Sequence, residues 1–182
     1  MKKRRDRPIL KRIALIFIIG LSAALQYNVA SHISIAGVLP NLMLVTAVTA
    51  GYTLGSEAGG FSGICLGLYQ DAQSGKILGM YALFFLYAGV IAGLFPKKTN
   101  AGDLPTALIA VYAITVLYEG AVYLFAYALP VLQSGFVPGM DLPHAVILVI
   151  IPAAFLNSLC SIPYYFILRP RGIVQESIEN RG

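Results

Sequence analysis

Six apolar runs, separated by turn-forming or charged residues, constrain this 182-residue chain more than any other feature. They cover residues 13–29, 38–54, 58–69, 77–95, 104–129 and 145–168. An apolar helix needs about 20 residues to cross the hydrocarbon core of a bilayer. Only 12% of the residues are charged, whereas an ordinary soluble domain carries roughly 25%. The sequence therefore predicts an all-α polytopic membrane protein with a single six-helix transmembrane domain over residues 13–168.

The third run has only 12 residues, so it is also compatible with a re-entrant segment that does not cross the membrane. Charge favours a full crossing, because cytoplasmic loops are enriched in lysine and arginine. Residues 1–12 carry seven basic side chains and one acidic side chain. Six crossings place this segment, Lys97, Lys98 and the arginines after residue 168 on one side, whereas five crossings separate them. We therefore expect a multi-pass membrane protein whose two tails, 1–12 and 169–182, are cytoplasmic.

The first run has a competing interpretation as a cleaved signal peptide. A basic start, the apolar residues 13–19 and the small residues Ser22, Ala23 and Ala24 are typical of such a peptide. Cleavage would leave five crossings and would disturb the charge distribution described above. We therefore favour a first helix that stays in the protein.

Small residues recur at every fourth position between residues 51 and 79. The set comprises Gly51, Gly55, Gly59, Gly63, Gly67, Gly75 and Gly79, with Asp71 in the same register. This spacing keeps neighbours on nearly one helix face, and glycine lets two membrane helices approach closely. A four-residue repeat drifts about 40° per step, however, and a turn expected at 55–57 and a loop expected at 71–76 divide it. We therefore expect Gly59, Gly63 and Gly67 to form one helix-packing face, and Gly75 to lie in a loop.

Three polar side chains are candidates for binding a partner or a ligand. Glu119 lies inside the fifth run, where an ionised carboxylate costs at least about 2.5–3.5 kcal/mol. Asp71 is expected at the outer surface, where the third run ends, and Asn157 lies midway along the sixth. Each also has a structural explanation: a protonated or hydrogen-bonded packing residue for Glu119, a helix-end carboxylate for Asp71, and a bridge between helices for Asn157.

The sequence lacks the motifs of several enzyme classes. It contains no HExxH, GxSxG or P-loop pattern. Cys65 and Cys160 lie in apolar runs without the spacing of a metal site, and a role as small buried side chains explains them. Basic residues concentrate at the N-terminus, which argues against nucleic acid and favours contact with membrane lipid. We therefore expect no catalytic residues, no metal and no cofactor.

Several short elements occur in one order along the chain. Leu39-Pro40-Asn41-Leu42-Met43 opens the second run, and a glycine-rich segment ends in Gln70-Asp71 and is followed by Leu78-Gly79. A lone Glu119 and then Asn157 come later. Over roughly residues 9–169, this order resembles the MreD family of bacterial rod shape-determining membrane proteins. The motifs of this resemblance add three residues to the candidates for binding a partner or a ligand, which are then Asp71, Glu119, Asn157, Gln70, Pro40 and Asn41.

The resemblance implies a non-catalytic protein of the bacterial inner membrane that acts in lateral peptidoglycan synthesis and cell shape. Its implied partner is a bitopic MreC-like protein, with indirect links to the actin-like MreB and to the RodA glycosyltransferase and its transpeptidase. The implied fold resembles the six-helix substrate-binding subunit of energy-coupling-factor vitamin transporters. That likeness keeps a second function open, as a membrane subunit that binds a small molecule. The Pro40-Asn41 and Gln70-Asp71 elements favour the shape protein.

Overall fold

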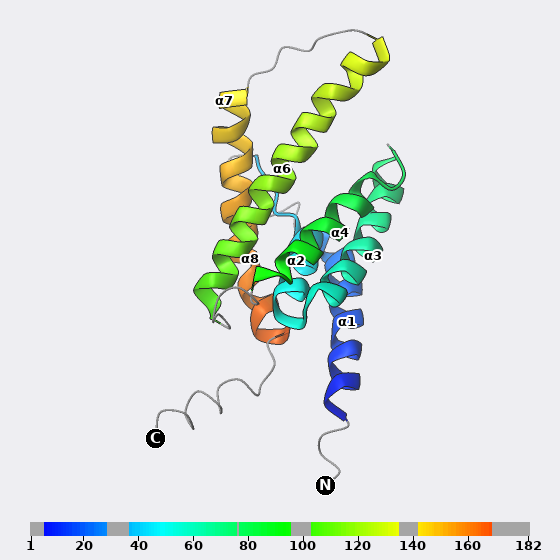
Figure 1. Cartoon of the computed structure of the whole chain (residues 1–182), viewed down its shortest axis with the longest axis vertical. Coiled ribbons are helices and arrows are strands. Elements are labelled where there is room, and N and C mark those ends of the chain that lie inside the picture. The colour runs from blue at the N-terminus through cyan, green and yellow to red at the C-terminus, as the bar shows by residue number, and fades with distance from the viewer. Residues whose placement is uncertain (1–5, 29–36, 76, 96–102, 135–141, 169–182) are drawn as a thin grey trace.

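The computed structural model describes residues 6–28, 37–75, 77–95, 103–134 and 142–168, and these parts of the chain are almost entirely helical (Figure 1). Six helical segments follow one another, because α7, η2 and α8 continue directly as one helix. The bounds are Asp6–Asn28 (α1), Leu42–Leu54 (α2), Ser56–Ser74 (α3), Met80–Ala92 (α4), Leu104–Ser134 (α6), Leu142–Ala145 (α7), Val146–Ile150 (η2) and Ile151–Leu168 (α8). The predicted all-α fold with six helices is confirmed for the described residues.

α2 is the central helix of the fold. Every residue from Leu42 to Tyr52 is buried, and the helix packs against α1, α3, α4, α6 and α8. Its side chains are aliphatic or small, with only threonine and tyrosine hydroxyls among them, so no face of it must reach water. A helix that is apolar all round is expected to be buried in this way.

The other helices form two groups around α2. One group contains α1, α3 and α4, and its closest contact is between α3 and α4. The other is the pair of α6 and α8, which joins the first group largely through α2 (Figure 1). The contact between α4 and α6 is much less extensive than that between α3 and α4. The C-terminal half of α6 and the neighbouring α7 extend past the ends of α2 and α4 (Figure 1).

The outer surface of the described helices is strongly apolar. Two helices, Leu104–Leu129 and Pro143–Leu168, are long and apolar enough to cross a bilayer, and shorter apolar helices cover Ile13–Asn28, Leu42–Leu54 and Met80–Ala92. Large apolar side chains remain exposed on several helices, among them Phe17, Leu83, Ile109, Leu124 and Phe166. We call these exposed side chains the lipid-facing surface. Soluble monomers rarely expose contiguous apolar patches of more than a few hundred Å², so this surface indicates contact with lipid.

The ends of α3 differ from the prediction. The helix has 19 residues, from Ser56 to Ser74, whereas the apolar run covers 58–69. At 1.5 Å per residue it is about 28 Å long, close to the hydrocarbon thickness of about 30 Å. The turn predicted at 55–57 is reduced to Gly55, whose φ of 103° ends α2 and lets α3 begin at once. The prediction of a loop at 71–76 is wrong for residues 71–74. These residues form the last helical turn of α3, and Asp71 is buried against α4.

Other helix ends also differ from the apolar runs. α2 begins at Leu42 and not at residue 38, because Asn41 caps it. α4 is shorter than the run at 77–95, and α6 continues to Ser134, into the joint expected from residue 130. Hydropathy detects apolar side chains and not the backbone geometry at which a helix begins or ends. The basic residues Lys97 and Lys98, the predicted tail 169–182 and residues 1–5 of the other tail lie outside the described residues.

Candidate functional site

Gly59, Gly63 and Gly67 lie on the face of α3 that packs against α4. A Cβ atom added at Gly63 would overlap the backbone carbonyl of Phe85, and one at Gly67 would overlap the first turn of α4. At Gly59, the added atom would overlap the backbone carbonyl of Gly89. The two helices therefore touch backbone to backbone, which is the close approach that glycine permits between membrane helices.

Gly51 of α2 joins this contact. A Cβ atom added there would also overlap the Gly89 carbonyl, so α2, α3 and α4 meet at glycines. The rest of the four-residue repeat forms turns and not packing surfaces. Positive φ angles of 103°, 61° and 95° occur at Gly55, Gly75 and Gly79, and an added Cβ would have nothing within 4 Å at these positions. Glycine adopts such angles without steric cost.

Asp71 is buried, with only 3% of its surface exposed, and its carboxylate is engaged inside the protein. Three backbone N–H groups at the start of α4 donate to it: those of Gly79 and Ala82 to Oδ2, at 2.9 and 3.1 Å, and that of Tyr81 to Oδ1, at 2.9 Å. Gly79, the N-cap residue of α4, has no side chain that could accept them. Asp71 therefore caps the neighbouring helix and places a negative charge at its positive end. Asp71 lies in the last turn of α3, near the helix end as expected, but its carboxylate is buried and not exposed at a surface, because close packing at the glycine face places it against α4.

Side chains from two other helices hold the start of α2. The Asn41 side chain accepts a hydrogen bond from the Leu44 N–H at 3.0 Å and so caps its own helix. The backbone N–H of Asn41 donates to Oδ1 of Asn157 on α8, at 2.7 Å. The next N–H, that of Leu42, donates to Oε1 of Gln26 on α1, at 2.7 Å. Three N–H groups at the start of α2 are therefore paired by side chains that come from α1, α8 and the N-cap of α2 itself.

This network extends on both sides of α2. Nε2 of Gln26 donates to the carbonyl of Pro40 at 3.1 Å. Nδ2 of Asn157, which is fully buried, donates to the Thr115 hydroxyl on α6 at 3.5 Å. Four helices thus meet at one level through amide and hydroxyl groups. In a bilayer these groups replace the water that would otherwise satisfy the backbone.

A second polar cluster lies about one turn before Gln26 on α1 and one turn after Leu42 on α2. The hydroxyls of Ser22 and Thr46 are 2.6 Å apart, and those of Ser22 and Tyr164 are 3.2 Å apart. All three side chains are buried. The sequence did not identify them, because isolated hydroxyl residues in an apolar helix usually bond their own backbone. Ser22 and Thr46 do that as well, to the carbonyls of Ile18 and Leu42.

Gln70 lies next to Asp71 but contacts a different helix. Its Oε1 accepts a hydrogen bond from the Tyr27 hydroxyl at 3.2 Å. Tyr27 also packs edge-on against Tyr69, with the ring centroids 6.2 Å apart. These contacts join the C-terminal ends of α1 and α3. Tyrosine at helix ends is typical of the interface between membrane and water.

Glu119 is half-buried on α6, one turn beyond Thr115 and the network at the start of α2. Its carboxylate is close enough to Tyr81 and Tyr118 to interact electrostatically with both. Within the described ranges, no donor forms a hydrogen bond to it. Glu119 therefore differs from Asp71, whose carboxylate is fully engaged by backbone groups.

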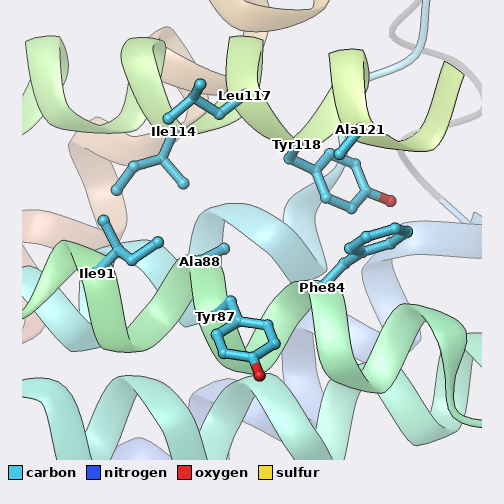
Figure 2. Close-up of a pocket in the computed structure, with 8 residues that line it drawn as sticks. All are labelled: Phe84, Tyr87, Ala88, Ile91, Ile114, Leu117, Tyr118 and Ala121. Carbon is cyan, nitrogen blue, oxygen red and sulfur yellow. The ribbon is translucent and has the colours of Figure 1, made fainter. Parts of the chain in front are cut away.

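A pocket of about 170 Å³ lies between α4 and α6 (Figure 2). It is lined by Phe84, Tyr87, Ala88, Ile91, Ile114, Leu117, Tyr118 and Ala121, and none of the sequence-predicted candidates is among them. The lining contains no carboxylate, imidazole or thiol. In the part of the chain that the structure describes, no group of three His, Cys, Asp or Glu side chains could hold a metal ion. The pocket can therefore hold an apolar group but offers no acid–base or metal chemistry.

The fold and these sites define a helical membrane protein built on close backbone packing and on buried polar bridges. In the described residues, the polar side chains form contacts between helices, and no recognisable group of catalytic side chains is present. The chain belongs to the MreD family: the family model for rod shape-determining protein MreD matches residues 6–170, nearly the whole chain. The resemblance noted from the sequence is therefore confirmed. Searches of curated proteins and of solved structures gave no match.

Family membership gives the chain a role in the determination of rod shape. The family is one of structural membrane proteins and is not known as a family of enzymes. The membrane location of the family agrees with the apolar surface of the described helices and with their two long apolar segments.

Proposed function

We propose that this chain is a non-catalytic membrane scaffold of the cell-elongation machinery. It binds an MreC-like bitopic protein and so supports lateral peptidoglycan synthesis, with indirect links to an MreB-like actin homologue and to a RodA-like glycosyltransferase and its transpeptidase. It crosses the inner membrane six times, with both tails in the cytoplasm. The family match supports the role in cell shape, and the resemblance of the sequence motifs supports the partners.

The partner-binding proposal rests on one observation, which is that no described residue donates a hydrogen bond to the Glu119 carboxylate. Asp71, Asn41, Asn157 and Gln70 all form hydrogen bonds within the chain, whereas no described residue donates one to Glu119. A carboxylate inside an apolar helix is costly and normally faces protein or a water-filled cavity. We therefore assign Glu119 to the contact with the MreC-like partner, which would supply a hydrogen-bond donor or a cation.

The alternative function, a subunit that binds a small polar molecule, is less well supported. It would need polar side chains that converge on a cavity. The Asp71 carboxylate is instead occupied by three backbone N–H groups, and the pocket between α4 and α6 has an apolar lining. These observations favour the scaffold.

The test compares Glu119→Gln with Glu57→Gln, which removes a charge from an exposed position on α3. We expect Glu119→Gln to reduce co-purification of the MreC-like protein and to round the cells, while the purified protein keeps its thermal stability. Glu57→Gln should leave both properties unchanged. Normal partner recovery and normal cell shape with Glu119→Gln would remove Glu119 from the partner contact.

A further inference from the structure

The pocket between α4 and α6 is a slit with a closed floor and open rims (Figure 2). Ala88, Ile114 and Tyr118 form the buried floor. Tyr87, Ile91 and Leu117 form the rims, with exposed fractions of 60%, 40% and 66%. The small side chain of Ala88 faces α6 across the slit (Figure 2).

An aromatic wall bounds the slit at the Phe84 end. Phe84 packs edge-on against Tyr118 and Phe125, with ring centroids 6.2 Å apart in both pairs. The Tyr87 hydroxyl points away from α6 (Figure 2), the Tyr118 hydroxyl is hydrogen-bonded to the Asn41 side chain, and the surface that lines the slit is almost entirely apolar. The slit therefore presents ring carbons and aliphatic carbons, without a hydrogen-bond partner for water.

The size and lining of the slit indicate what it can hold. A buried water needs two to four polar partners, whereas an apolar cavity of about 150 Å³ stays dry and binds a hydrocarbon such as benzene. The slit, at about 170 Å³, is of that size. An empty slit would leave the floor side chains without contacts on one side, which is unfavourable. A hydrocarbon group needs no polar partner and fills the space above the floor side chains, so it suits the slit better than water or a void.

The slit is continuous with the surface that faces lipid. Its rim residues Ile91 and Leu117 are exposed apolar side chains, like Leu83 on α4 and Ile109 and Leu124 on α6. The material that reaches it from the side in a bilayer is therefore hydrocarbon. We propose that the slit between α4 and α6 binds one acyl chain of a membrane phospholipid. The bound chain completes the contact between α4 and α6, which the protein itself makes only in part.

Photolabelling tests this site directly. The full-length protein is reconstituted into vesicles of phosphatidylethanolamine and phosphatidylglycerol that contain a phospholipid with a diazirine in one acyl chain. Adducts are mapped by mass spectrometry of peptides. We expect adducts on 84–91 and 114–121 to exceed those on other exposed positions, such as Phe17 and Phe166. Equal labelling along the lipid-facing surface would overturn the proposal.

Two leucine substitutions on α6 supply the matched control. Ala121→Leu adds bulk inside the slit, whereas Ala126→Leu adds the same bulk at an exposed position outside its lining. Ala121→Leu should lose most of the slit adducts and Ala126→Leu should keep them. If Ala121→Leu does not fold, a photoreactive residue in place of the rim residue Leu117 gives the same information in native membranes. An adduct with lipid supports the site, and an adduct with another polypeptide in place of lipid overturns it.

Discussion

Asp71 on α3 and Ala82 on α4 are joined by a hydrogen bond of 3.1 Å, from the Ala82 N–H to the Asp71 carboxylate. One turn earlier on α3, a Cβ atom at Gly67 would overlap the backbone of the same Ala82. The glycine face and the cap therefore depend on each other. Close approach at Gly67 brings the carboxylate within reach of the N–H groups at the start of α4, and the cap holds the two helix ends together.

Removal of the cap should destabilise the hairpin of α3 and α4. Asp71→Ala leaves the N–H groups of Gly79, Tyr81 and Ala82 without an acceptor, and Asp71→Asn replaces one acceptor oxygen by a donor. Loss of a helix cap costs about 0.5–2 kcal/mol, and we expect Asp71→Ala to fall at the upper end, because three donors are affected. Thermal unfolding of the purified protein in detergent measures this as a lower Tm.

Glu57→Gln is the control for this prediction, since it removes an acidic charge from an exposed position on the same helix. Its Tm should stay close to that of the unmodified protein. If Asp71→Ala kept its Tm but lost the MreC-like partner, Asp71 would act in partner binding and not as a cap.

Alanine at Gly63 should separate α3 from α4. The added methyl group would overlap the backbone carbonyl of Phe85, which cannot move unless α4 moves with it. Gly120 on α6 is the matched control, because an added Cβ there has nothing within 4 Å. In a helix interior, Gly→Ala without a clash stabilises by roughly 0.5–1 kcal/mol. We therefore expect a lower Tm for Gly63→Ala and an equal or higher Tm for Gly120→Ala.

The comparison with Gly120 is cleaner than one with Gly75. Gly75 lies outside the packing face, but its φ of 61° is unfavourable for other residues, so any substitution there adds backbone strain. If Gly63→Ala and Gly120→Ala had the same Tm, the close contact between α3 and α4 would not contribute to stability.

The features that the sequence made visible are local ones. Six apolar runs give six helices, because each helix follows from the side chains within it. The spacing of Gly59, Gly63 and Gly67 marks a face because residues four apart lie on one side of a helix. The structure places that face against α4.

The features that the sequence did not show depend on contacts between distant segments. The role of Asp71 depends on backbone N–H groups eight to eleven residues later in the chain. Every residue except proline has such a group, so the residue types do not reveal which ones Asp71 binds. The cluster of Ser22, Thr46 and Tyr164 joins helices that are up to 142 positions apart. The slit between α4 and α6 likewise depends on which side chains of two helices face each other, and hydropathy does not report that.

Loss of the Asn157 amide should loosen the start of α2. Asn157→Ala leaves the backbone N–H of Asn41 without its acceptor and removes the donor to Thr115. A buried group left unpaired costs about 1–3 kcal/mol, although hydrogen bonds between membrane helices average only about 0.6 kcal/mol. We expect a loss of about 1 kcal/mol, measured as a lower Tm in detergent. Gln73→Ala, which removes an exposed amide from α3, should have little effect. A Tm for Asn157→Ala as high as that of Gln73→Ala would show that the bridge to α8 is not needed.

The ends of α3 should be accessible from opposite sides of the membrane. With 19 residues the helix is about 28 Å long, enough to cross the hydrocarbon core nearly upright. Single cysteines replace Gln73 and Glu57, which are exposed near the two ends, in a protein whose Cys65 and Cys160 are alanine. In spheroplasts, a membrane-impermeant maleimide should label Gln73→Cys at once, and Glu57→Cys only after the membrane is broken.

Labelling of both variants in denaturant is the control, because it shows that each thiol can react. The expected orientation rests on the basic N-terminal segment, which predicts that the N-terminus and the start of α3 lie on the cytoplasmic side. Labelling of both cysteines only after the membrane is broken would make α3 re-entrant from the cytoplasmic side and leave five crossings. The two tails would then lie on opposite sides of the membrane, and an MreC-like partner would meet the C-terminal tail outside the cytoplasm.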